Sequence, residues 1–561
     1  MARYLCSTLV LVLMAAATPA QTTKAVNIIP DDALGFILIK DLSDLSARVD
    51  NLAKKLKVEE RVSLLELIQK EMGIREGINP KGSALFILLA GKDKKSLSEF
   101  VVALPVADHE KIARQLGLKN SPETITQGEV GLVSGMLAGI GGKGPEGTPT
   151  KFPVLVAKRD DFILLTHTGG RAGLEAVLNS KKSIAATLEP VRDWLDKQDM
   201  SGICTDHGVR TGLAMFLGGP GGSVETSSPG QFAQMKATFA EVEKNVKLIA
   251  FGGQIEKDGH ARLSTAVHFQ PDGSYAQWIA KADLLERTLL NRLPDQPQLV
   301  TALARISTQT TFEGAASILF GDLPADKVDP LKKELAKLVQ QVSEVAVCIY
   351  ASDSAGIAVP IKGVPGLSLG QQVFLAQVKD AGSFLDNSVD FLKHCNRAAN
   401  AAAKTKVEIN YQEKEIAGKS ARLITVKGIE APKGKNGKEG SQIYLLAALD
   451  GKTVLGCMLA NESEAEPQVA KFSKLADRPL RKNAAMHKTQ GLLPEKLQIE
   501  VFFDLQAFGV LGEPSKKAVS QVAPLGFALR AIPAGLEAQF VIPFDALQAV
   551  FDAIKSEKDS K

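Results

Sequence analysis

The sequence predicts an α+β chain of two related halves, each a mainly antiparallel sheet with amphipathic helices, produced by tandem duplication. Three observations lead to this prediction. Short apolar runs are joined by hairpin signals such as Asp450-Gly451. Longer segments place leucines at three- and four-residue spacing, as one face of a helix does. The same landmarks then recur in the same order along the 561 residues. Hairpins between successive strands favour this class over a doubly wound parallel fold.

Each half opens with a proline-aspartate turn, a strand and a helix. Ile29-Pro30-Asp31 precedes an apolar run at Gly35–Ile39, and Leu293-Pro294-Asp295 precedes a run at Leu299–Ile306. Both runs are followed by segments with helical periodicity. The two apolar stripes are formed by Leu42, Leu45, Val49, Leu52 and Leu56, and by Leu331, Leu335, Leu338, Val342 and Val345.

Three further landmarks follow in each half. A strand ends at Asp108 or Asp380 directly before a helix, where the carboxylate is expected to cap the helix. A hairpin turns at Asp160-Asp161 or at Asp450-Gly451, and the second pair suits a type I′ turn. The expected strands of these landmarks are Val101–Val106, Val373–Val378, Val154–Lys158, Phe162–Leu165, Tyr444–Ala448 and Thr453–Leu455. The fifth landmark is Ile203–Thr205 running into Asp206, matched by Glu500–Phe503 running into Asp504.

Each half also closes with a hairpin and a helix. The hairpin strands are expected at Leu248–Ile255 with Ala261–Phe269, and at Gly526–Ile532 with Leu536–Ile542. The closing helices begin near Asp272 and Asp545.

The separation between matched landmarks grows steadily along the chain. It is smallest for Pro30 and Pro294, larger for Asp108 and Asp380, and largest for Asp206 and Asp504. Slowly growing insertions are what a diverged tandem duplication leaves, although an ordinary α+β chain with similar units is the alternative. We place the boundary at residue 288, ahead of a proline-rich stretch. The predicted modules are residues 21–288 and 289–561.

Residues 1–20 have the features of a signal peptide. Arg3 provides a positive charge, Leu5–Ala17 is an apolar run too short to span a bilayer, and Ala20 ends the segment with a small residue. Cleavage is expected before Gln21. No later run of eighteen apolar residues occurs, so the mature chain is expected to be soluble and either periplasmic or extracellular.

Composition and charge argue against several classes of protein. The hydrophobic content of 45% excludes a disordered chain. The formal net charge of +4 is small for this length, and no basic stripe interleaved with aromatic residues occurs, so a nucleic-acid partner is not expected. The mature chain retains four cysteines, Cys204, Cys348, Cys395 and Cys457. Buried free thiols are the expected state, with one disulfide in the second half as the alternative.

Three short motifs match catalytic or binding patterns without the context that the chemistry needs. Ser368 lies in a G-x-S-x-G sequence, but a strand rather than a helix is expected after it. His109-Glu110 begins like a zinc-protease helix, but Ala113 replaces the second histidine. Gly142–Gly147 fits G-x-G-x-x-G without a clear helix start after it.

Cys204-Thr205-Asp206-His207 is the densest reactive cluster. A cysteine beside a histidine can act as a nucleophile with its base. Residues on a strand point alternately to opposite faces, however, and Asp206 is better interpreted as a helix cap like Asp41 and Asp504. His394-Cys395 is interpreted as a structural pair near a helix end.

The chain resembles a class of large exported bacterial proteins with tandem α+β modules and no assigned function. The resemblance is in the openings at Ile29-Pro30-Asp31 and Leu293-Pro294-Asp295, the strands that end at Asp108 and Asp380, and the signal peptide. It covers most of the mature chain. The resemblance implies an exported, duplicated and non-enzymatic protein, and it implies no catalytic residues.

We therefore assign no catalytic, cofactor-binding or metal-binding residue and expect no cofactor. The favoured hypothesis is an envelope or secreted protein that binds another envelope protein or serves as a scaffold. The first alternative is a carrier of an apolar ligand such as a lipid, in a pocket lined by Ala84–Ala90 and Val154–Leu165, which could equally be core. The second is an enzyme with residues from distant loops, where Cys204 with His207, or Ser368, would be tested first.

Overall fold

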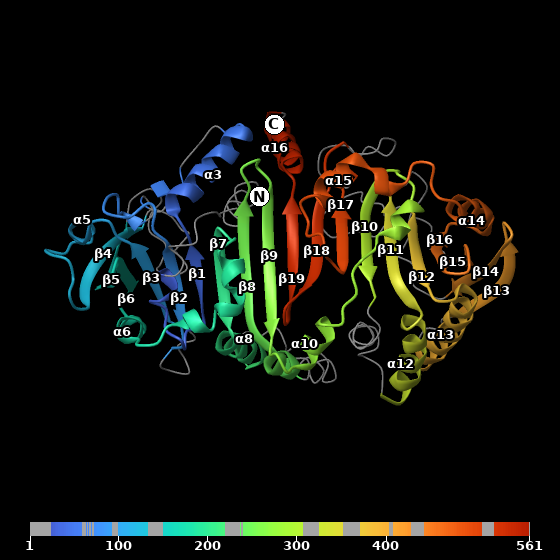
Figure 1. Cartoon of the computed structure of the whole chain (residues 1–561), viewed down its shortest axis with the longest axis horizontal. Coiled ribbons are helices and arrows are strands. Elements are labelled where there is room, and N and C mark those ends of the chain that lie inside the picture. Colours follow the sequence, from blue (N-terminus) through green and yellow to red (C-terminus); the bar gives the residue numbers. More distant parts are fainter. Residues whose placement is uncertain are drawn as a thin grey trace. The chain divides into compact units, whose positions relative to one another are not determined.

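The computed structural model describes residues 24–559 except for 59–62, 64, 67, 68, 70, 71, 92–98, 133–149, 219–235, 237, 238, 307–324, 352–370, 403–407, 428–441 and 508–520. The chain divides into two compact units, both of which combine helices with an antiparallel sheet (Figure 1). The fold is therefore α+β. Unit 1 comprises residues 1–225 and 239–273, and unit 2 comprises residues 226–238 and 274–561. The units divide between Gly273 and Ser274, ahead of the boundary expected at residue 288.

Unit 1 contains an antiparallel sheet whose described strands follow the order β4-β5-β6-β3-β2-β1-β7-β8-β9. The strands are β1 (Gly35–Ile39), β2 (Ala84–Leu89), β3 (Glu99–Pro105), β4 (Thr126–Leu132), β5 (Thr150–Arg159), β6 (Phe162–His167), β7 (Met200–Thr205), β8 (Val246–Ile255) and β9 (Ala261–Phe269).

Helices cover parts of both faces of this sheet. We call the face that holds Leu38 and Leu85 face A, and the face that holds Ile39 and Ala84 face B. On face A, α6 buries Leu174 and packs against β3, β5 and β6. On face B, α3 and α5 contribute Leu42 and Ile112 to one apolar cluster. The helical segments are α3 (Leu42–Lys55), α5 (His109–Gln115), α6 (Arg171–Asn179), η1 (Ile184–Ala186), η2 (Glu189–Val191), α7 (Arg192–Leu195) and α8 (Asp206–Gly218).

Unit 2 contains a second antiparallel sheet, in the order β13-β14-β15-β16-β12-β11-β10-β17-β18-β19. The strands are β10 (Gln298–Arg305), β11 (Val342–Tyr350), β12 (Gln372–Val378), β13 (Glu408–Ile416), β14 (Lys419–Lys427), β15 (Gln442–Ala448), β16 (Thr453–Leu459), β17 (Ile499–Phe503), β18 (Leu525–Ile532) and β19 (Gly535–Ile542).

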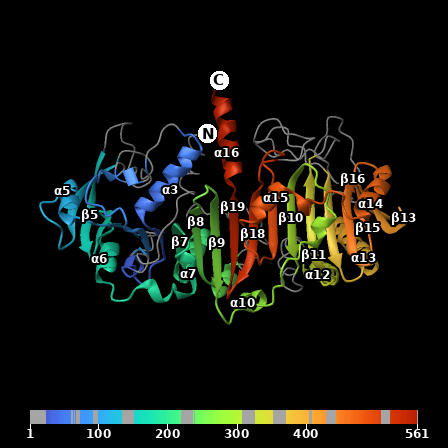
Figure 2. The same cartoon turned by 45° about the horizontal axis from the view of Figure 1, so that its top comes forward.

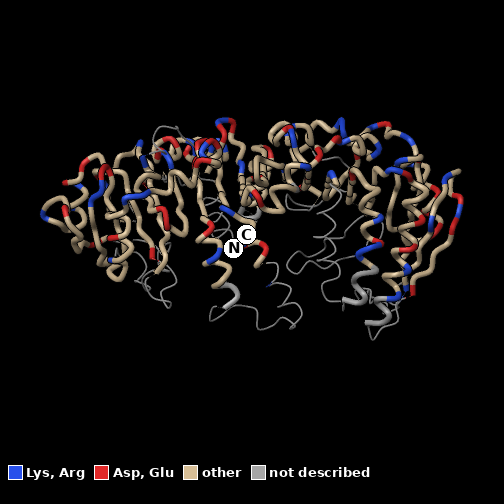
Figure 3. Tube along the Cα trace, turned by 60° about the horizontal axis from the view of Figure 1, so that its bottom comes forward, with Lys and Arg blue, Asp and Glu red and all other residues tan. Residues whose placement is uncertain are grey.

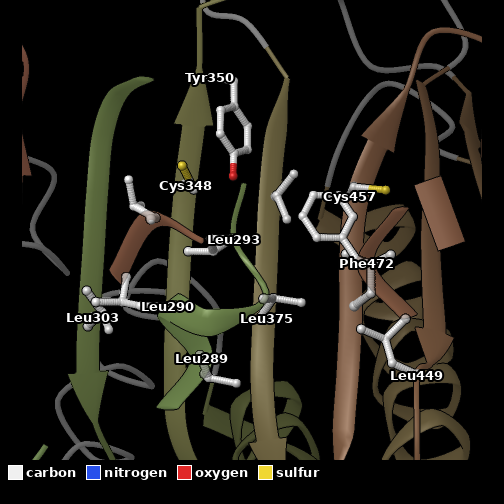
Figure 4. Close-up of a cluster of buried hydrophobic side chains, with 14 of the residues drawn as sticks. Leu289, Leu290, Leu293, Leu303, Cys348, Tyr350, Leu375, Leu449, Cys457 and Phe472 are labelled. Carbon is white, nitrogen blue, oxygen red and sulfur yellow. The ribbon is translucent and has the colours of Figure 1, made fainter. Parts of the chain in front are cut away.

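The main core of unit 2 lies on its face A, which we define by Leu303 and Ala346. Leu290, Leu293 and Phe472 pack there against Leu375 and other strand residues (Figure 4). On the opposite face, α12 and α13 lie side by side and pack against the adjacent strands β11, β12, β16 and β15 (Figure 2). The helical segments are α10 (Ser274–Ile279), η4 (Thr288–Asn291), α12 (Ala325–Val339), α13 (Ala381–Ala402), η5 (Glu462–Glu464), α14 (Ala465–Ser473), η6 (Leu480–Lys482), α15 (Ala484–Gln490) and α16 (Phe544–Asp559).

Strand order and register agree between the two units. In unit 1, Ile37 of β1 pairs with Phe86 of β2, which pairs with Val102 of β3. In unit 2, Ala302 of β10 pairs with Val347 of β11, which pairs with Phe374 of β12. We call this residue-by-residue match the strand correspondence. It also matches Gly35 and Cys204, paired between β1 and β7, with Val300 and Phe503, paired between β10 and β17.

The sequence landmarks support the strand correspondence independently. Because Val102 matches Phe374, the residues six positions later, Asp108 and Asp380, match as well, as the sequence predicts. The remaining pairs, β4–β5, β5–β6, β3–β6, β7–β8 and β8–β9, match β14–β15, β15–β16, β12–β16, β17–β18 and β18–β19. Strand β13 has no counterpart among the described strands of unit 1.

The opening turns make matching contacts in the two units. The carbonyl of Ile29 accepts a hydrogen bond from Ile184 N at 3.0 Å, and that of Leu293 accepts one from Leu480 N at 2.8 Å. Pro30 and Pro294 each form an isolated β-bridge beside these bonds. The proline-aspartate openings therefore hold equivalent positions in the two sheets.

The helix caps predicted at Asp41, Asp108 and Asp380 are confirmed, whereas Asp206 is not a cap and Asp504 accepts hydrogen bonds in a turn. Asp108 and Asp380 accept hydrogen bonds from Lys111 N and Ser383 N, as N-caps do. Asp206 is instead the first residue of α8, and the hydroxyl of Thr205 accepts from Gly208 N.

Thr205, and not Asp206, is the counterpart of Asp504. Thr205 N donates to the carbonyl of Leu34, and Asp504 N donates to the equivalent carbonyl of Leu299. The match between Asp206 and Asp504 expected from the sequence is therefore displaced by a single position.

Two local predictions are wrong. The helical stripe expected from Leu331 to Val345 is too long, because α12 ends at Val339 and Val342 already belongs to β11. The connection at Asp450-Gly451 is not a type I′ turn, since that turn needs positive φ at both residues and neither has it. Asp450 accepts a hydrogen bond from Lys452 N instead, within a longer loop between β15 and β16.

Candidate functional site

The cysteine-histidine cluster at Cys204 is not arranged as a nucleophile and base. Cys204 is partly buried on β7, and its thiol donates to the carbonyl of Thr205 at 3.8 Å. Burial raises the pKa of this thiol, which disfavours the reactive thiolate. His207 is exposed in the first turn of α8, and its backbone N–H donates to Asp206.

The histidine of the zinc-like motif lies at the start of a helix. His109 is the first residue of α5, beside the cap Asp108. Burial, and then the neighbouring charge of Lys158, lower the pKa of His109. Within the described part of the chain, no three His, Cys, Asp or Glu side chains converge to hold a metal ion.

The four cysteines of the described chain are free, so the alternative of a disulfide is not observed. Burial raises the pKa of Cys348 and Cys395 to about 11 and that of Cys457 to about 12. Cys395 and its neighbour His394 lie inside α13, rather than near a helix end as expected. The motifs at Ser368 and Gly142–Gly147 lie outside the described residues.

The strands expected to line an apolar pocket contribute largely to the cores. Leu85 and Ile87 of β2 are buried on face A, and Val156 and Ile163 are buried in the cluster on face B. Two small hollows, of about 140 and 120 Å³, lie elsewhere, next to α13 and α3. Ligand pockets usually enclose at least about 300 Å³, so neither hollow accommodates a large ligand.

A larger apolar surface is present on face B of unit 2, and we call it the unit 2 strip. It is formed by outward-pointing residues of four adjacent strands, all partly exposed: Val300, Ala302, Ala304, Ile499, Val501, Phe503, Leu525, Phe527, Leu529, Leu536, Ala538 and Phe540. None of these side chains carries a charge or a hydrogen-bonding group. The strip is thus a continuous apolar part of the sheet.

The opposite face of the same strands carries polar residues. Glu500, Glu537 and Gln539 are exposed by 0%, 3% and 8%, respectively. Arg287 Nε donates to Glu500 at 2.7 Å, and Arg530 Nε donates to Glu537 at 2.6 Å. An antiparallel sheet with one solvated face normally presents its polar residues to water and its apolar residues to the core. Here charged residues are buried on face A beside the core residues Phe502, Ala528 and Val541, while the apolar residues of the strip on face B are partly exposed.

Unit 1 has an equivalent surface on β1, β7, β8 and β9, which we call the unit 1 strip. Its partly or fully exposed members are Ile37, Ile39, Met200, Cys204, Ile249, Phe251, Leu263, Thr265 and Val267. Phe251 is 42% exposed, and its ring lies over Gly202, where a Cβ would come within 1.9 Å of the ring. This strip is less apolar than that of unit 2, because it contains Thr265 and because Gly202 stands at the position that Val501 holds in unit 2.

Sequence reasoning missed both strips. The sequence does contain a signal for the unit 2 strip. In Ile499–Phe503 and Leu525–Ile532, the alternate residues that start with Ile499 and Leu525 are all apolar, so neither strand has a polar residue on that face. Charged residues of both signs are interspersed along the chain trace of both units (Figure 3). None of the described helices combines the length and apolar composition needed to cross a bilayer.

No protein-family model matches the chain, and no curated protein is similar to it. Two solved structures, crystal forms III and I of a protein named TP0453, are similar over 49% of this chain and 99% of theirs. Their sequences are 8% identical to this chain, with TM-scores of 0.24 and 0.23. Similarity at this level supports no conclusion about fold or function.

Proposed function

We propose that the protein is a non-enzymatic, exported carrier that holds the acyl chain of a lipid on the strips of its two units. The partly exposed and wholly apolar face B of strands β17, β18 and β19 supports this proposal most directly. Water in contact with Phe503, Phe527 and Phe540 is unfavourable, by roughly 25 cal/mol for each Å² of apolar surface. An apolar ligand that covers these residues would remove that cost.

The chemistry of the unit 2 strip favours an acyl chain over a protein partner. Protein–protein interfaces contain about one hydrogen bond per 100–200 Å², so a docking surface normally offers polar groups. The side chains of this strip offer none. A saturated hydrocarbon chain requires no such groups, and each methylene that it buries contributes about 0.8 kcal/mol. A scaffold that binds another envelope protein is the competing function.

Palmitate binding tests the proposal on the purified full-length chain. Phe527→Glu places a charge in the centre of the unit 2 strip and is expected to weaken palmitate binding at least about tenfold. Leu475→Glu is the matched control, because Leu475 is 67% exposed and lies outside the strip. Circular dichroism of both variants shows whether the fold is retained.

Equal palmitate affinity for Phe527→Glu and the unmodified chain would contradict the proposal, as would the absence of any binding. A photo-crosslinker at Val501 distinguishes the competing function in cell envelopes. A crosslinked lipid supports the carrier. A single crosslinked protein in place of lipid would overturn the carrier in favour of the scaffold.

We also propose that the two units are products of a tandem duplication. The support is the agreement in strand order and register. The pair Gly35 and Cys204 in unit 1 corresponds to the pair Val300 and Phe503 in unit 2, and the other matched strand pairs agree in the same way. An experimentally determined structure in which the two units superimpose with these registers would support common descent. Different registers in the two sheets would contradict it.

Export by a signal peptide cleaved before Gln21 completes the proposal. Its support is the apolar run Leu5–Ala17 with Arg3 ahead of it. Intact-mass analysis of the protein from its own cells is expected to give a chain that starts at Gln21. A chain that retains Met1 would contradict export by this route.

A further inference from the structure

A second feature of unit 1 is a group of four buried polar side chains, each with an atom that has no hydrogen-bond partner. Their unpartnered atoms are Lys40 Nζ, Ser83 Oγ, Gln198 Oε1 and Ser201 Oγ. The four residues are exposed by only 1–4%. We call this group the Lys40 centre.

Strand pairing brings the four side chains to one place on face A. Ile39 pairs with Ala84 on one side and with Met200 on the other, so the next residue, Lys40, lies between Ser83 and Asp199. Ser201 pairs with Gly252. A Cβ on Gly252 would lie 2.7 Å from the side chain of Gln198, which packs over this glycine.

No carboxylate of the described chain neutralises Lys40 by direct contact. Asp196 and Asp199 are near enough to favour its charged form, but neither forms a hydrogen bond or ion pair with Nζ. Asp199 Oδ2 accepts from Ile255 N at 3.1 Å and lies 4.0 Å from Arg48 Nη1. Buried ammonium and hydroxyl groups without partners are costly, and native proteins normally supply a bound water or ligand.

Unit 2 shows what an equivalent position contains. The strand correspondence matches Lys40, Ser83 and Ser201 with Arg305, Glu344 and Glu500. Arg305 Nη1 donates to the Glu286 carboxylate at 3.2 Å. Glu344 accepts from Glu286 N at 3.0 Å, and Glu500 accepts from Arg287 Nε at 2.7 Å. In this unit, a carboxylate therefore lies on the cation and a donor group lies on each acid, although Arg305 Nε and Glu344 Oε1 also lack partners.

The Lys40 centre differs from its counterpart in two ways that favour an added molecule. Serines replace the two glutamates, so each of these side chains is shorter and offers a hydroxyl donor. The cation is retained without the acidic side chain that contacts it in unit 2. Lys40 and the two serines can donate to a carboxylate, and Gln198 Oε1 can accept from a hydroxyl or amino group.

We infer that the Lys40 centre of unit 1 binds a small carboxylate that also carries a hydrogen-bond donor, such as a hydroxy acid or an amino acid. The carboxylate takes the place on Lys40 that Glu286 occupies on Arg305. The donor group of the ligand pairs with Gln198. This site lies on face A, and the inference is independent of acyl-chain binding on face B.

Glycolate is the probe, and thermal unfolding of the full chain is the measurement. At saturating glycolate, with sodium chloride at equal ionic strength as reference, the melting temperature is expected to rise by about 2 °C or more. Lys181→Met, the change of an exposed lysine, should retain this rise. Lys40→Met should lose it, because the cation that holds the carboxylate is removed.

A rise that persists in Lys40→Met would overturn the site, as would equal melting temperatures in glycolate and chloride. Acetylation of the unmodified chain provides a second measurement that needs no variant. Glycolate is expected to slow acetylation of Lys40 without affecting Lys181, and an unchanged rate at Lys40 would overturn the inference. A crystal structure of the glycolate complex in which the carboxylate lies away from Lys40 would also overturn it.

Discussion

The two units share a strand order and a register but differ in how they treat the same buried position. In unit 2, Arg305 and Glu500 form ion pairs with Glu286 and Arg287, although Arg305 Nε lacks a partner. In unit 1, the corresponding Lys40 and Ser201 have unpartnered atoms. The comparison shows that main-chain pairing fixes the sheet, while the polar side chains inside it can be exchanged without a change of register.

The strips differ in the same manner. Val501 and Phe527 lie side by side in unit 2, and the equivalent pair in unit 1 is Gly202 and Phe251. Because Gly202 has no side chain, the end of the Phe251 ring occupies the space that a Cβ would fill. Unit 2 therefore presents the broader apolar surface, and we expect it to hold the acyl chain more tightly than unit 1.

A large difference between the units is expected from removal of the buried charges. Arg287→Met leaves Glu500 fully buried without its cation and should destabilise unit 2 by about 3 kcal/mol. Without ligand, Lys40→Met removes an unpartnered charge and should leave unit 1 equally or more stable.

The two tryptophans allow each unit to be followed separately. Trp194 belongs to unit 1 and Trp278 to unit 2, so urea unfolding with one tryptophan replaced by phenylalanine reports on one unit. Arg287→Met with Glu500→Leu is the control and should recover most of the lost stability. Equal losses for Arg287→Met and Lys40→Met would show that the two centres do not differ.

A difference in pH dependence should follow from Asp199, whose counterpart in unit 2 is the non-ionising Gln498. Burial raises the pKa of Asp199 from 3.8 to about 8, so the folded state binds an extra proton between these values. Unit 1 should therefore lose stability as pH rises from about 4 to 8, by up to about 1.4 kcal/mol per pH unit. Burial lowers the pKa of Lys40 to about 8, so part of this stability should return at higher pH.

Asp199→Asn should remove the decline between pH 4 and 8, as followed by Trp194 fluorescence. Asp193→Asn is a suitable control, because Asp193 is an exposed residue of α7. A decline of the same slope in Asp199→Asn would assign it to another group.

A smaller effect is expected where the strips differ. Gly202→Val recreates the unit 2 pair but must displace the Phe251 ring, and overpacking of this kind costs about 1 kcal/mol. The double variant Gly202→Val with Phe251→Ala should be less destabilised than the sum of its single changes. Additive losses by urea unfolding would show that the ring does not depend on the glycine.

The smallest effects should be equal in the two units. Thr205→Ala and Asp504→Ala each remove the side chain that accepts a hydrogen bond from the residue three positions later. Each change should cost about 1 kcal/mol. Asp206→Ala should lower the free energy of unfolding by less than Thr205→Ala does. A larger loss for Asp206→Ala in urea unfolding would show that Asp206 is the cap.

The local elements could be predicted from sequence, because their signals are local. Asp258-Gly259 indicated the β8–β9 hairpin, and the period of the apolar residues indicated α3. The strips and the Lys40 centre could not be predicted in this way. Lys40, Ser83 and Ser201 are far apart in the chain, and only the β2–β1–β7 pairing brings them together. Asp206 was mistaken for a cap because an aspartate is a stronger signal than the preceding threonine.

The most direct test of the carrier function is mass spectrometry of the full-length mature protein from its native envelope, under native and then denaturing conditions. The carrier predicts an additional mass in the range of a lipid, bound under native conditions and lost on denaturation. The same mass should be absent from Phe527→Glu and present in Leu475→Glu. A bare chain mass under both conditions would contradict the proposal that the strips hold an acyl chain.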